Sequence, residues 1–270
     1  MTPQIGNPPW DRSDLLRAIG EFERLYDERP IRDNVGGMKA PHMFATWFMA
    51  RALRPELIVE SGIWMGQSTW LLERACPDAR LVSIDLDLSR RAYISPKATY
   101  VDRDFSTLDW TAIVPERTLA FFDDHQNAYT RLQQCLWFGF KHTIFEDNYP
   151  PSQGDCYSLK KALSESGFEP ALLQSGLREK VASWLGVRPP APAPGVRPNR
   201  QDAAMLRRNL EVYYEFPPVF KRARTRWGDP WTDGHYPTPP PLLEEGDAAS
   251  HAAFYEEADH YTWIGYARLK

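Results

Sequence analysis

The sequence lacks the cysteine content of a disulfide-stapled or cysteine-zinc protein. Its 270 residues include only three cysteines, Cys76, Cys135 and Cys156, which lie far apart and show no CxxC spacing. An odd number of widely spaced cysteines argues against a disulfide framework and against a zinc site. We therefore expect free thiols in a reducing compartment and predict a cytoplasmic protein.

Long apolar runs and an excess of basic charge are also missing. No run reaches the roughly 18–20 apolar residues that span a bilayer, and the first residues lack the pattern of a signal peptide. The 32 basic residues are outnumbered by 36 acidic ones, which gives a formal charge of −4. This balance offers no electrostatic attraction for nucleic acid or an anionic membrane. We expect a soluble protein with neither of them as a partner.

The first part of the chain contains short apolar runs that alternate with helical patterns. Helices are predicted over 13–29 and 41–53, and again over 67–76 and 129–137. Strands are predicted over five ranges: 57–60, 81–85, 98–101, 118–122 and 143–146. This alternation predicts an α/β fold with a doubly wound, mostly parallel sheet in the order 3-2-1-4-5.

The last third differs in composition, since it holds many of the 24 prolines and 10 tryptophans. Helices are predicted over 158–166 and 202–216, a Pro-rich spacer over 186–200 and a final strand over 261–269. The chain then divides into four parts. These are N-terminal helices that cover a ligand site (1–55), the α/β core (56–185), a Pro- and Trp-rich elaboration that encloses a substrate (186–258), and the final strand of the sheet (259–270).

A glycine turn follows the first strand. Residues 59–68 read VESGIWMGQS, with Gly62 and Gly66 in GxxxG spacing after Glu60. Open α/β sheets bind ligands at such a position, and glycine allows the backbone to approach a ligand closely. A dinucleotide fingerprint needs a third glycine, as GxGxxG. Its absence points to a nucleotide-like ligand without a pyrophosphate, and a simple tight turn remains the alternative.

Acidic residues follow the next two strands. Asp85 ends the second strand, where a carboxylate can accept both hydrogen bonds of a ribose diol. Asp104 follows the third strand and can accept from an adenine amino group while Phe105 packs on the ring. Glu60 can meet the amino group of the ligand, directly or through water. Alternatively, the two aspartates only cap the elements that follow them.

Polar residues also follow the fourth and fifth strands. Neighbouring parallel strands would bring Asp123, Asp147 and Asn148 to one rim, where three oxygen ligands suit Mg²⁺ or a similar hard ion. His125 titrates near neutrality and is a candidate general base, with Asp124 beside it. The alternative is that these residues cap helices and line a wet cleft.

These motifs resemble those of class I S-adenosylmethionine-dependent methyltransferases, and in particular of metal-dependent O-methyltransferases of the catechol O-methyltransferase kind. Residues 60–68 resemble the first motif of that family, and Asn34-Val35-Gly36 with Lys39 resembles the loop over the methionine part of the cofactor. Asp123 with the later Tyr129, and Asp147-Asn148, resemble its metal-binding residues. In sugar and macrolide O-methyltransferases and cephalosporin-hydroxylase-like proteins, the corresponding places would be taken by Asp124-His125 and Glu146-Asp147.

The resemblance covers roughly residues 31–150 and implies a set of roles. It implies a metal site of Asp123, Asp147 and Asn148, and catalytic roles for His125 and Asp124. The catalytic lysine of the family is replaced by Gln126, which leaves the base open. Members often form homodimers. The implied cofactor-binding residues are Val35, Gly36, Lys39, Glu60, Gly62, Trp64, Gly66, Gln67, Ser68, Asp85, Asp104, Phe105 and Asp123.

From these observations we predict an S-adenosylmethionine-dependent methyltransferase that uses Mg²⁺ or another divalent cation. It would methylate an oxygen of a small hydroxylated substrate, a sugar or a secondary metabolite. The alternatives are a metal-independent N- or C-methyltransferase and a noncatalytic ligand-binding protein on the same fold. Aromatic residues of the elaboration either line a substrate wall or pack the elaboration itself: Trp184, Tyr213, Tyr214, Trp227, Trp231 and Tyr236.

Overall fold

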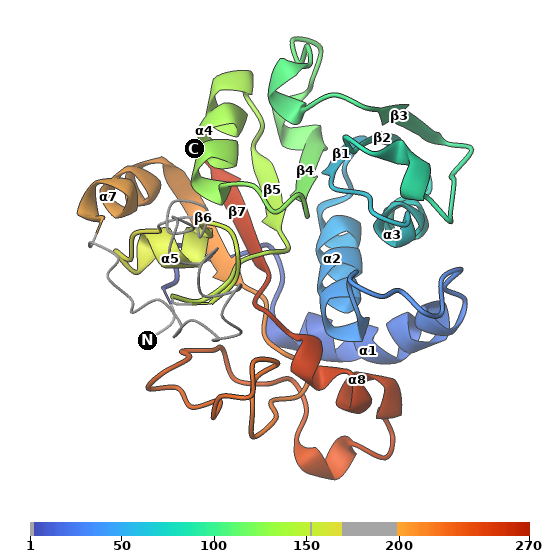
Figure 1. Cartoon of the computed structure of the whole chain (residues 1–270), viewed down its shortest axis with the longest axis vertical. Helices are drawn as coiled ribbons and strands as arrows, with labels where there is room; N and C mark the ends of the chain where they lie inside the picture. Colours follow the sequence, from blue (N-terminus) through green and yellow to red (C-terminus); the bar gives the residue numbers. More distant parts are fainter. Residues whose placement is uncertain (1–2, 152, 169–198) are drawn as a thin grey trace, which may run out of the picture.

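A seven-stranded mixed sheet runs through the molecule (Figure 1). The computed structural model describes residues 3–151, 153–168 and 199–270. The strand order is β3-β2-β1-β4-β5-β7-β6, and β7 runs antiparallel to both of its neighbours. The predicted α/β sheet and its order 3-2-1-4-5 are confirmed, and the complete order is typical of the class I methyltransferase fold. The strands are β1 (Leu57–Ser61), β2 (Arg80–Ile84), β3 (Ala98–Val101), β4 (Thr118–Phe122), β5 (His142–Phe145), β6 (Leu210–Glu215) and β7 (Gly265–Leu269).

Helices cover both faces of this sheet (Figure 1). One apolar cluster contains side chains of α1 (Arg12–Asp27), α2 (Ala40–Leu53) and α3 (Gln67–Ala75). Another contains side chains of α4 (Ala128–Phe138), α5 (Leu159–Leu163) and α7 (Arg200–Asn209). Successive strand residues point to opposite faces, so Ile58 joins the first cluster and Val59 the second. Burial on both faces explains the continuous apolar stretches of these strands, residues 57–59 in β1 and 119–122 in β4.

The C-terminal elements differ from their predicted bounds. The helix predicted over 202–216 is wrong in its second half, because α7 ends at Asn209 and the next six residues form β6. These residues, LEVYYE, include β-branched and aromatic side chains that favour a strand paired with β7. The final strand starts at Gly265 rather than at residue 261. A short helix, α8 (Ala252–Glu256), was not predicted, and most of the Pro-rich spacer lies outside the described residues.

Aromatic side chains pack the elaboration against the sheet. The rings of Trp227 and Trp263 are stacked 6.3 Å apart, and those of Trp231 and Tyr261 are stacked 5.7 Å apart. Trp231 and Tyr236 are buried, in agreement with the packing interpretation of these residues. Trp184 lies outside the described residues. Within the described part of the chain, no helix combines the length and the hydropathy needed to cross a membrane.

A buried ion pair connects α5 to β6. Lys160 Nζ lies 2.6 Å from Glu215 Oε2 and also donates to the carbonyl of Pro237, at 3.0 Å. The two charged side chains are 1% and 3% exposed. Burial lowers the pKa of Lys160 and raises that of Glu215, so each group depends on its partner to stay charged. Removing only one member of such a pair strongly destabilises the fold.

We expect Lys160→Met to lower the free energy of unfolding by about 3–5 kcal/mol, because Glu215 would be left buried without a counter-charge. Urea unfolding followed by circular dichroism measures the change. The matched control is Lys221→Met, since Lys221 pairs at 2.5 Å with Asp233, whose side chain is 74% exposed. That change should cost about 0–1 kcal/mol. Equal losses in the two variants would contradict the role given to Lys160.

Candidate functional site

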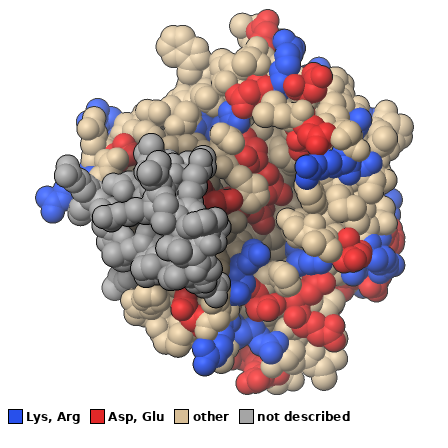
Figure 2. Space-filling model, in the orientation of Figure 1, with Lys and Arg blue, Asp and Glu red and all other residues tan. Residues whose placement is uncertain are grey.

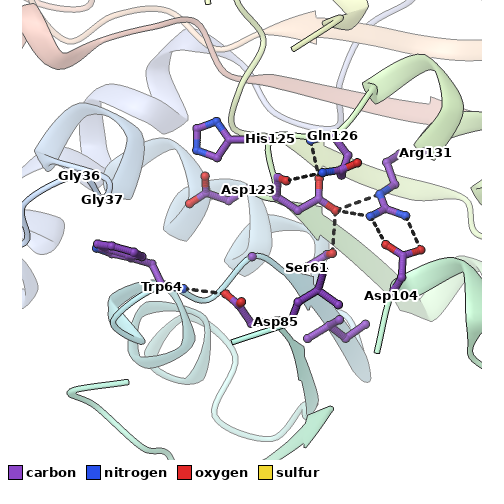
Figure 3. Close-up of a pocket in the computed structure, with 14 residues that line it drawn as sticks. Gly36, Gly37, Ser61, Trp64, Asp85, Asp104, Asp123, His125, Gln126 and Arg131 are labelled. Atoms are coloured by element: carbon purple, nitrogen blue, oxygen red, sulfur yellow. Dashed lines mark hydrogen bonds and ion pairs between the residues drawn. The ribbon is translucent and has the colours of Figure 1, made fainter. Parts of the chain in front are cut away.

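A cavity of about 470 Å³ opens at the carboxyl ends of β1 and β4 (Figure 3). The strand order reverses between these two strands, and open α/β sheets bind ligands at such a switch point. Its volume is in the range of about 300–1,000 Å³ that small-molecule sites occupy. Eight of the predicted site residues line it: Gly36, Gly62, Trp64, Asp85, Asp104, Asp123, Asp124 and His125. The other lining residues are Gly37, Ser61, Ile84, Leu86, Gln126 and Arg131.

The two glycines of the turn after β1 are required by neighbouring backbone. Gly62 and Gly66 have φ angles of 94° and 92°, which other residues rarely adopt. A Cβ at Gly62 would lie 2.0 Å from the carbonyl oxygen of Asp123, and one at Gly66 would lie 2.4 Å from that of Tyr93. The missing Cβ therefore lets the turn pack directly against the end of β4, where Asp123 begins the acidic segment.

Asp85 holds the same turn from the other side. Its Oδ2 accepts from the backbone N–H groups of Ile63, at 2.9 Å, and Trp64, at 3.1 Å. Trp64 in turn donates from Nε1 to the carbonyl of Val35, at 3.0 Å. This bond fastens the loop of Val35 and Gly36 to the turn. The Val35 side chain itself is 66% exposed and does not line the cavity.

Glu60 lies beneath the turn and is fully buried. Its Oε2 accepts from the hydroxyls of Thr69 and Ser83, both at 2.7 Å. Its Oε1 has no hydrogen-bond partner among the described residues, and burial raises the pKa of the carboxyl. Gln67 and Ser68, also buried, line a small crevice beside Trp64 and Asp123. These residues support the cavity from below and leave one buried oxygen, Glu60 Oε1, without a partner.

Arg131 joins two of the predicted acids (Figure 3). Its guanidinium makes two hydrogen bonds to Asp104, at 2.6 and 3.1 Å, and lies 2.8 Å from Asp124 Oδ2. The hydrogen bonds from Arg131 lower the pKa of Asp104. Asp124 also accepts from the Ser61 hydroxyl, at 2.7 Å, so its carboxylate is engaged within the fold. Arg131 was not predicted, although it is the only charged residue of α4, and that isolation was the available signal.

Phe105 does not line the cavity. Its side chain has no exposed surface and packs in the core against the rings of Trp110, Phe122 and Phe140. The expected stacking of its ring on an adenine base is therefore not supported. Asp104 does line the cavity, and it also caps the following turn by accepting from Ser106 N, at 2.9 Å.

Three side chains at the ends of β4 and β5 can share one cation. Ligand atoms of Asp123, His125 and Asp147 lie within 4.8 Å of one another. Burial raises the pKa of both aspartates, and the carboxylate of Glu146 raises them further. Asp147 Oδ2 is buried and has no hydrogen-bond partner within the described chain. Crowded carboxylates with an unused oxygen fit a divalent cation, because it would supply the missing positive charge.

His125 supplies positive charge to the same cluster. Its Nδ1 lies 3.2 Å from Asp155 Oδ1 and 3.4 Å from Asp147 Oδ2. The hydrogen bond with Asp155 and the nearby carboxylates raise the pKa of His125 to about 9, although burial opposes this. The imidazole is therefore protonated at neutral pH when no cation is bound, and it offsets part of the negative charge.

Glu146 has a histidine partner that sequence reasoning missed. His42 Nε2 accepts from the backbone N–H of Thr262, at 2.9 Å, so the ring hydrogen must be on Nδ1. That nitrogen donates to Glu146 Oε1 at 2.5 Å. Burial disfavours the charge on Glu146, but His42, Asp147 and His125 together outweigh burial, and the pKa of Glu146 is lowered. The signal in the sequence was a lone histidine in the apolar helix α2, whose partner is 104 residues away.

Asn148 is not part of the cluster of Asp123, His125 and Asp147. It is fully buried, its Nδ2 donates to the Tyr213 hydroxyl at 2.8 Å, and its Oδ1 accepts from Lys160 N at 2.9 Å. Both polar atoms thus have partners within the fold. Asn148 is not among the three residues whose ligand atoms come together.

A second cavity, of about 160 Å³, shares a wall with the first. The residues common to both are Gly36, Gly37, Asp123 and His125. The rest of its lining comes from the loop before α2, the end of β5 and the elaboration: Met38, Lys39, Glu146, Asp147, Tyr149, Arg226, His260 and Thr262. Figure 2 shows a hollow on this face with acidic atoms in its depth and basic atoms on its lower edge. The structure thus places Lys39, predicted to contact a cofactor, in the second cavity.

We expect Gly62→Ala to destabilise the fold more than Gly139→Ala. Gly139 ends α4 at a φ of 84° with open space around its Cβ position, so alanine there adds only backbone strain, about 1–2 kcal/mol. Alanine at Gly62 adds the same strain and a collision with the Asp123 carbonyl, for which about 1–3 kcal/mol more is expected. Thermal or urea unfolding compares the two variants. Equal costs would show that the turn and the end of β4 can separate freely.

Comparisons with known proteins find only distant similarity. No family model matches the chain, and no curated protein is significantly similar to it in sequence. Among solved structures, the O-methyltransferase TomG from Streptomyces achromogenes is 16% identical with a TM-score of 0.46, covering 98% of this chain and 92% of that one. The methyltransferase PaMTH1 from Podospora anserina is 12% identical with a TM-score of 0.41, covering 98% and 89%. The structure of CmcI-N160 with SAH is 22% identical with a TM-score of 0.35, covering 54% and 82%. We therefore take the function from the site itself.

Proposed function

We propose that this chain is an S-adenosylmethionine-dependent methyltransferase that methylates an oxygen of a small hydroxylated molecule with the help of a divalent cation. The observation that carries the proposal is the pair of cavities that meet at Asp123 and His125. One cavity lies at the switch point of the sheet and the other contains the candidate cation site. A transfer reaction needs donor and acceptor held side by side in this way.

The larger cavity has the features that S-adenosylmethionine needs. The turn at Gly62 brings backbone close to a ligand, and Asp85 lies on the rim where a ribose diol would be bound. Glu60 is fully buried beneath the turn and does not line this cavity, so its Oε1 would meet an amino group of the ligand only through water. When bound, S-adenosylmethionine supplies the methyl group.

Asp123, His125 and Asp147 would hold the cation. When bound, a divalent cation lowers the pKa of a substrate hydroxyl and fixes its direction. Neighbouring contacts hold this region in place, since His42 anchors Glu146, the residue before Asp147, and Asp155 anchors the imidazole of His125. Nδ1 of His125 faces Asp155 and Asp147, so Nε2 is the nitrogen that would either bind the cation or take a substrate proton, and it cannot do both at once.

A metal-independent methyltransferase is the second candidate, and one observation favours it. Protonated His125 already places a positive charge beside Asp147. The cluster could therefore orient an acceptor by hydrogen bonds alone, with nitrogen or carbon as the methylated atom.

We expect S-adenosylmethionine to bind with a dissociation constant below a millimolar, measured by isothermal titration calorimetry. Asp85→Ala should weaken binding about tenfold or more, since a charge-assisted hydrogen bond contributes about 1.5–3 kcal/mol. The control is Asp109→Ala, because Asp109 is an exposed acid that only caps Thr111. An absence of binding at millimolar cofactor would overturn the proposed function and favour a noncatalytic protein that binds another ligand.

We expect EDTA to abolish methyl transfer and Mg²⁺ or Mn²⁺ to restore it. Direct binding of Mn²⁺, followed by electron paramagnetic resonance, should be lost in Asp147→Asn, because that change removes the charge of the unpartnered carboxylate. Asn148→Ala is the comparison. It should lower stability through its lost bonds to Tyr213 and Lys160 but keep Mn²⁺ binding.

Two outcomes would contradict this expectation. Full activity in EDTA would favour the metal-independent reaction. Loss of Mn²⁺ binding in Asn148→Ala as complete as in Asp147→Asn, in a variant that remains folded, would show that Asn148 is itself a ligand.

A further inference from the structure

Basic side chains from two distant parts of the chain line the second cavity. Lys39 comes from the loop before α2, whereas Arg226 comes from the elaboration and His260 from the segment just before β7. The opposite lining contains the acids of the candidate cation site. The cavity therefore has an acidic floor, where the two cavities meet, and a basic rim.

Two basic side chains of the rim have no polar partner within the described part of the fold. Neither Lys39 nor Arg226 forms an ion pair with a described residue, and neither side chain donates a hydrogen bond to one. Other basic residues near the site are fully engaged: Arg131 contacts two aspartates, and Lys160 contacts Glu215. The acids of the floor have closer partners in His42 and His125. Lys39 and Arg226 form no ion pair with these acids in the described fold.

We propose that the methyl acceptor is an anion, with a carboxylate or phosphate held by Lys39 and Arg226 and a hydroxyl placed at Asp123, His125 and Asp147. A guanidinium binds carboxylate or phosphate through two parallel hydrogen bonds, and an ammonium adds a compact charge. The floor would repel the acid group and the rim would attract it, so only one orientation brings the hydroxyl to the first cavity. This inference rests on the proposed function and adds the charge class of its substrate.

Lys39 has an alternative role, in binding the cofactor rather than the acceptor, and the two roles must be distinguished by experiment. In the resemblance to methyltransferases, its loop covers the methionine part of the cofactor, which carries a carboxylate of its own. In the structure Lys39 lines the second cavity and not the first. Arg226, from the elaboration, likewise lines only the second cavity.

The test uses two matched pairs of probes that differ only in charge. Protocatechuate is compared with its amide, and glucose-6-phosphate with glucose, so that a carboxylate and a phosphate are distinguished. Binding is titrated with the enzyme saturated by S-adenosylhomocysteine and Mg²⁺, which prevents turnover, and initial rates are then measured with S-adenosylmethionine. The variants are Arg226→Gln and Lys39→Gln. The control is Arg224→Gln, an exposed neighbour whose guanidinium donates to the carbonyl of Gly228.

We expect the anionic member of at least one pair to bind about tenfold or more tightly than its neutral partner. Arg226→Gln and Lys39→Gln should remove most of that preference, mainly through KM, whereas Arg224→Gln should retain it. Affinity for S-adenosylmethionine should stay within about threefold in all three variants. The inference would be overturned if the wild-type enzyme bound the neutral probes as tightly as the anionic ones, or if it bound neither anionic probe.

Failure of the proposed function gives a different result. In that case S-adenosylmethionine itself would not bind to the wild-type protein, whatever the probes do. If Lys39→Gln weakens cofactor binding and leaves the preference for the anionic probe unchanged, Lys39 belongs to the cofactor and its assignment to the acceptor is overturned.

Discussion

The concentration of buried negative charge at the ends of β4 and β5 is the constraint on which the rest of the site depends. Adjacent parallel strands end at one edge, and the register Phe122 with Phe145 brings the next residues, Asp123 and Glu146, together. Like charges in a poorly solvated place repel strongly, so the fold must supply hydrogen-bond donors or positive charge, or bind a cation. His42 reaches Glu146 from α2 and is itself held by Thr262 N. The acids thereby tie the N-terminal helices to the last segment of the chain.

A second constraint joins this acidic edge to the glycine turn. Because Gly62 has no Cβ, the turn lies directly against the carbonyl of Asp123, and the two cavities share Asp123 and His125 as a wall. The motif that resembles a cofactor loop therefore also determines how near a ligand of the first cavity lies to one in the second. Widening the turn would separate the two ligands even if each still bound.

Features that depend on local sequence were predictable, whereas those that depend on distant partners were not. Strand order and the acids at strand ends follow from apolar runs and the glycine turn. The strand at 210–215 was predicted as helix because it is stabilised by pairing with β7, over 50 residues later. His42 and Arg131 were missed for the same reason, since their acidic partners are 104 and 27 residues away in sequence. Phe105 was assigned to a ligand because its burial depends on rings from other elements.

In the segment after β5, two residues are held by hydrogen bonds while a buried oxygen of the residue between them has none. Glu146 is held on one side by His42, and Asn148 on the other by Tyr213 and Lys160. Between them Asp147 keeps a buried oxygen, Oδ2, without a hydrogen bond in the described chain. His125 Nδ1 lies 3.4 Å from this oxygen and offsets its charge without a hydrogen bond. A buried carboxylate oxygen without a hydrogen bond costs free energy, so its position between two firmly held neighbours argues for a ligand that completes it. The buried pair of Lys160 and Glu215 is part of the same network, since the Lys160 backbone N–H donates to Asn148 and Glu215 accepts from the Tyr213 hydroxyl that Asn148 contacts.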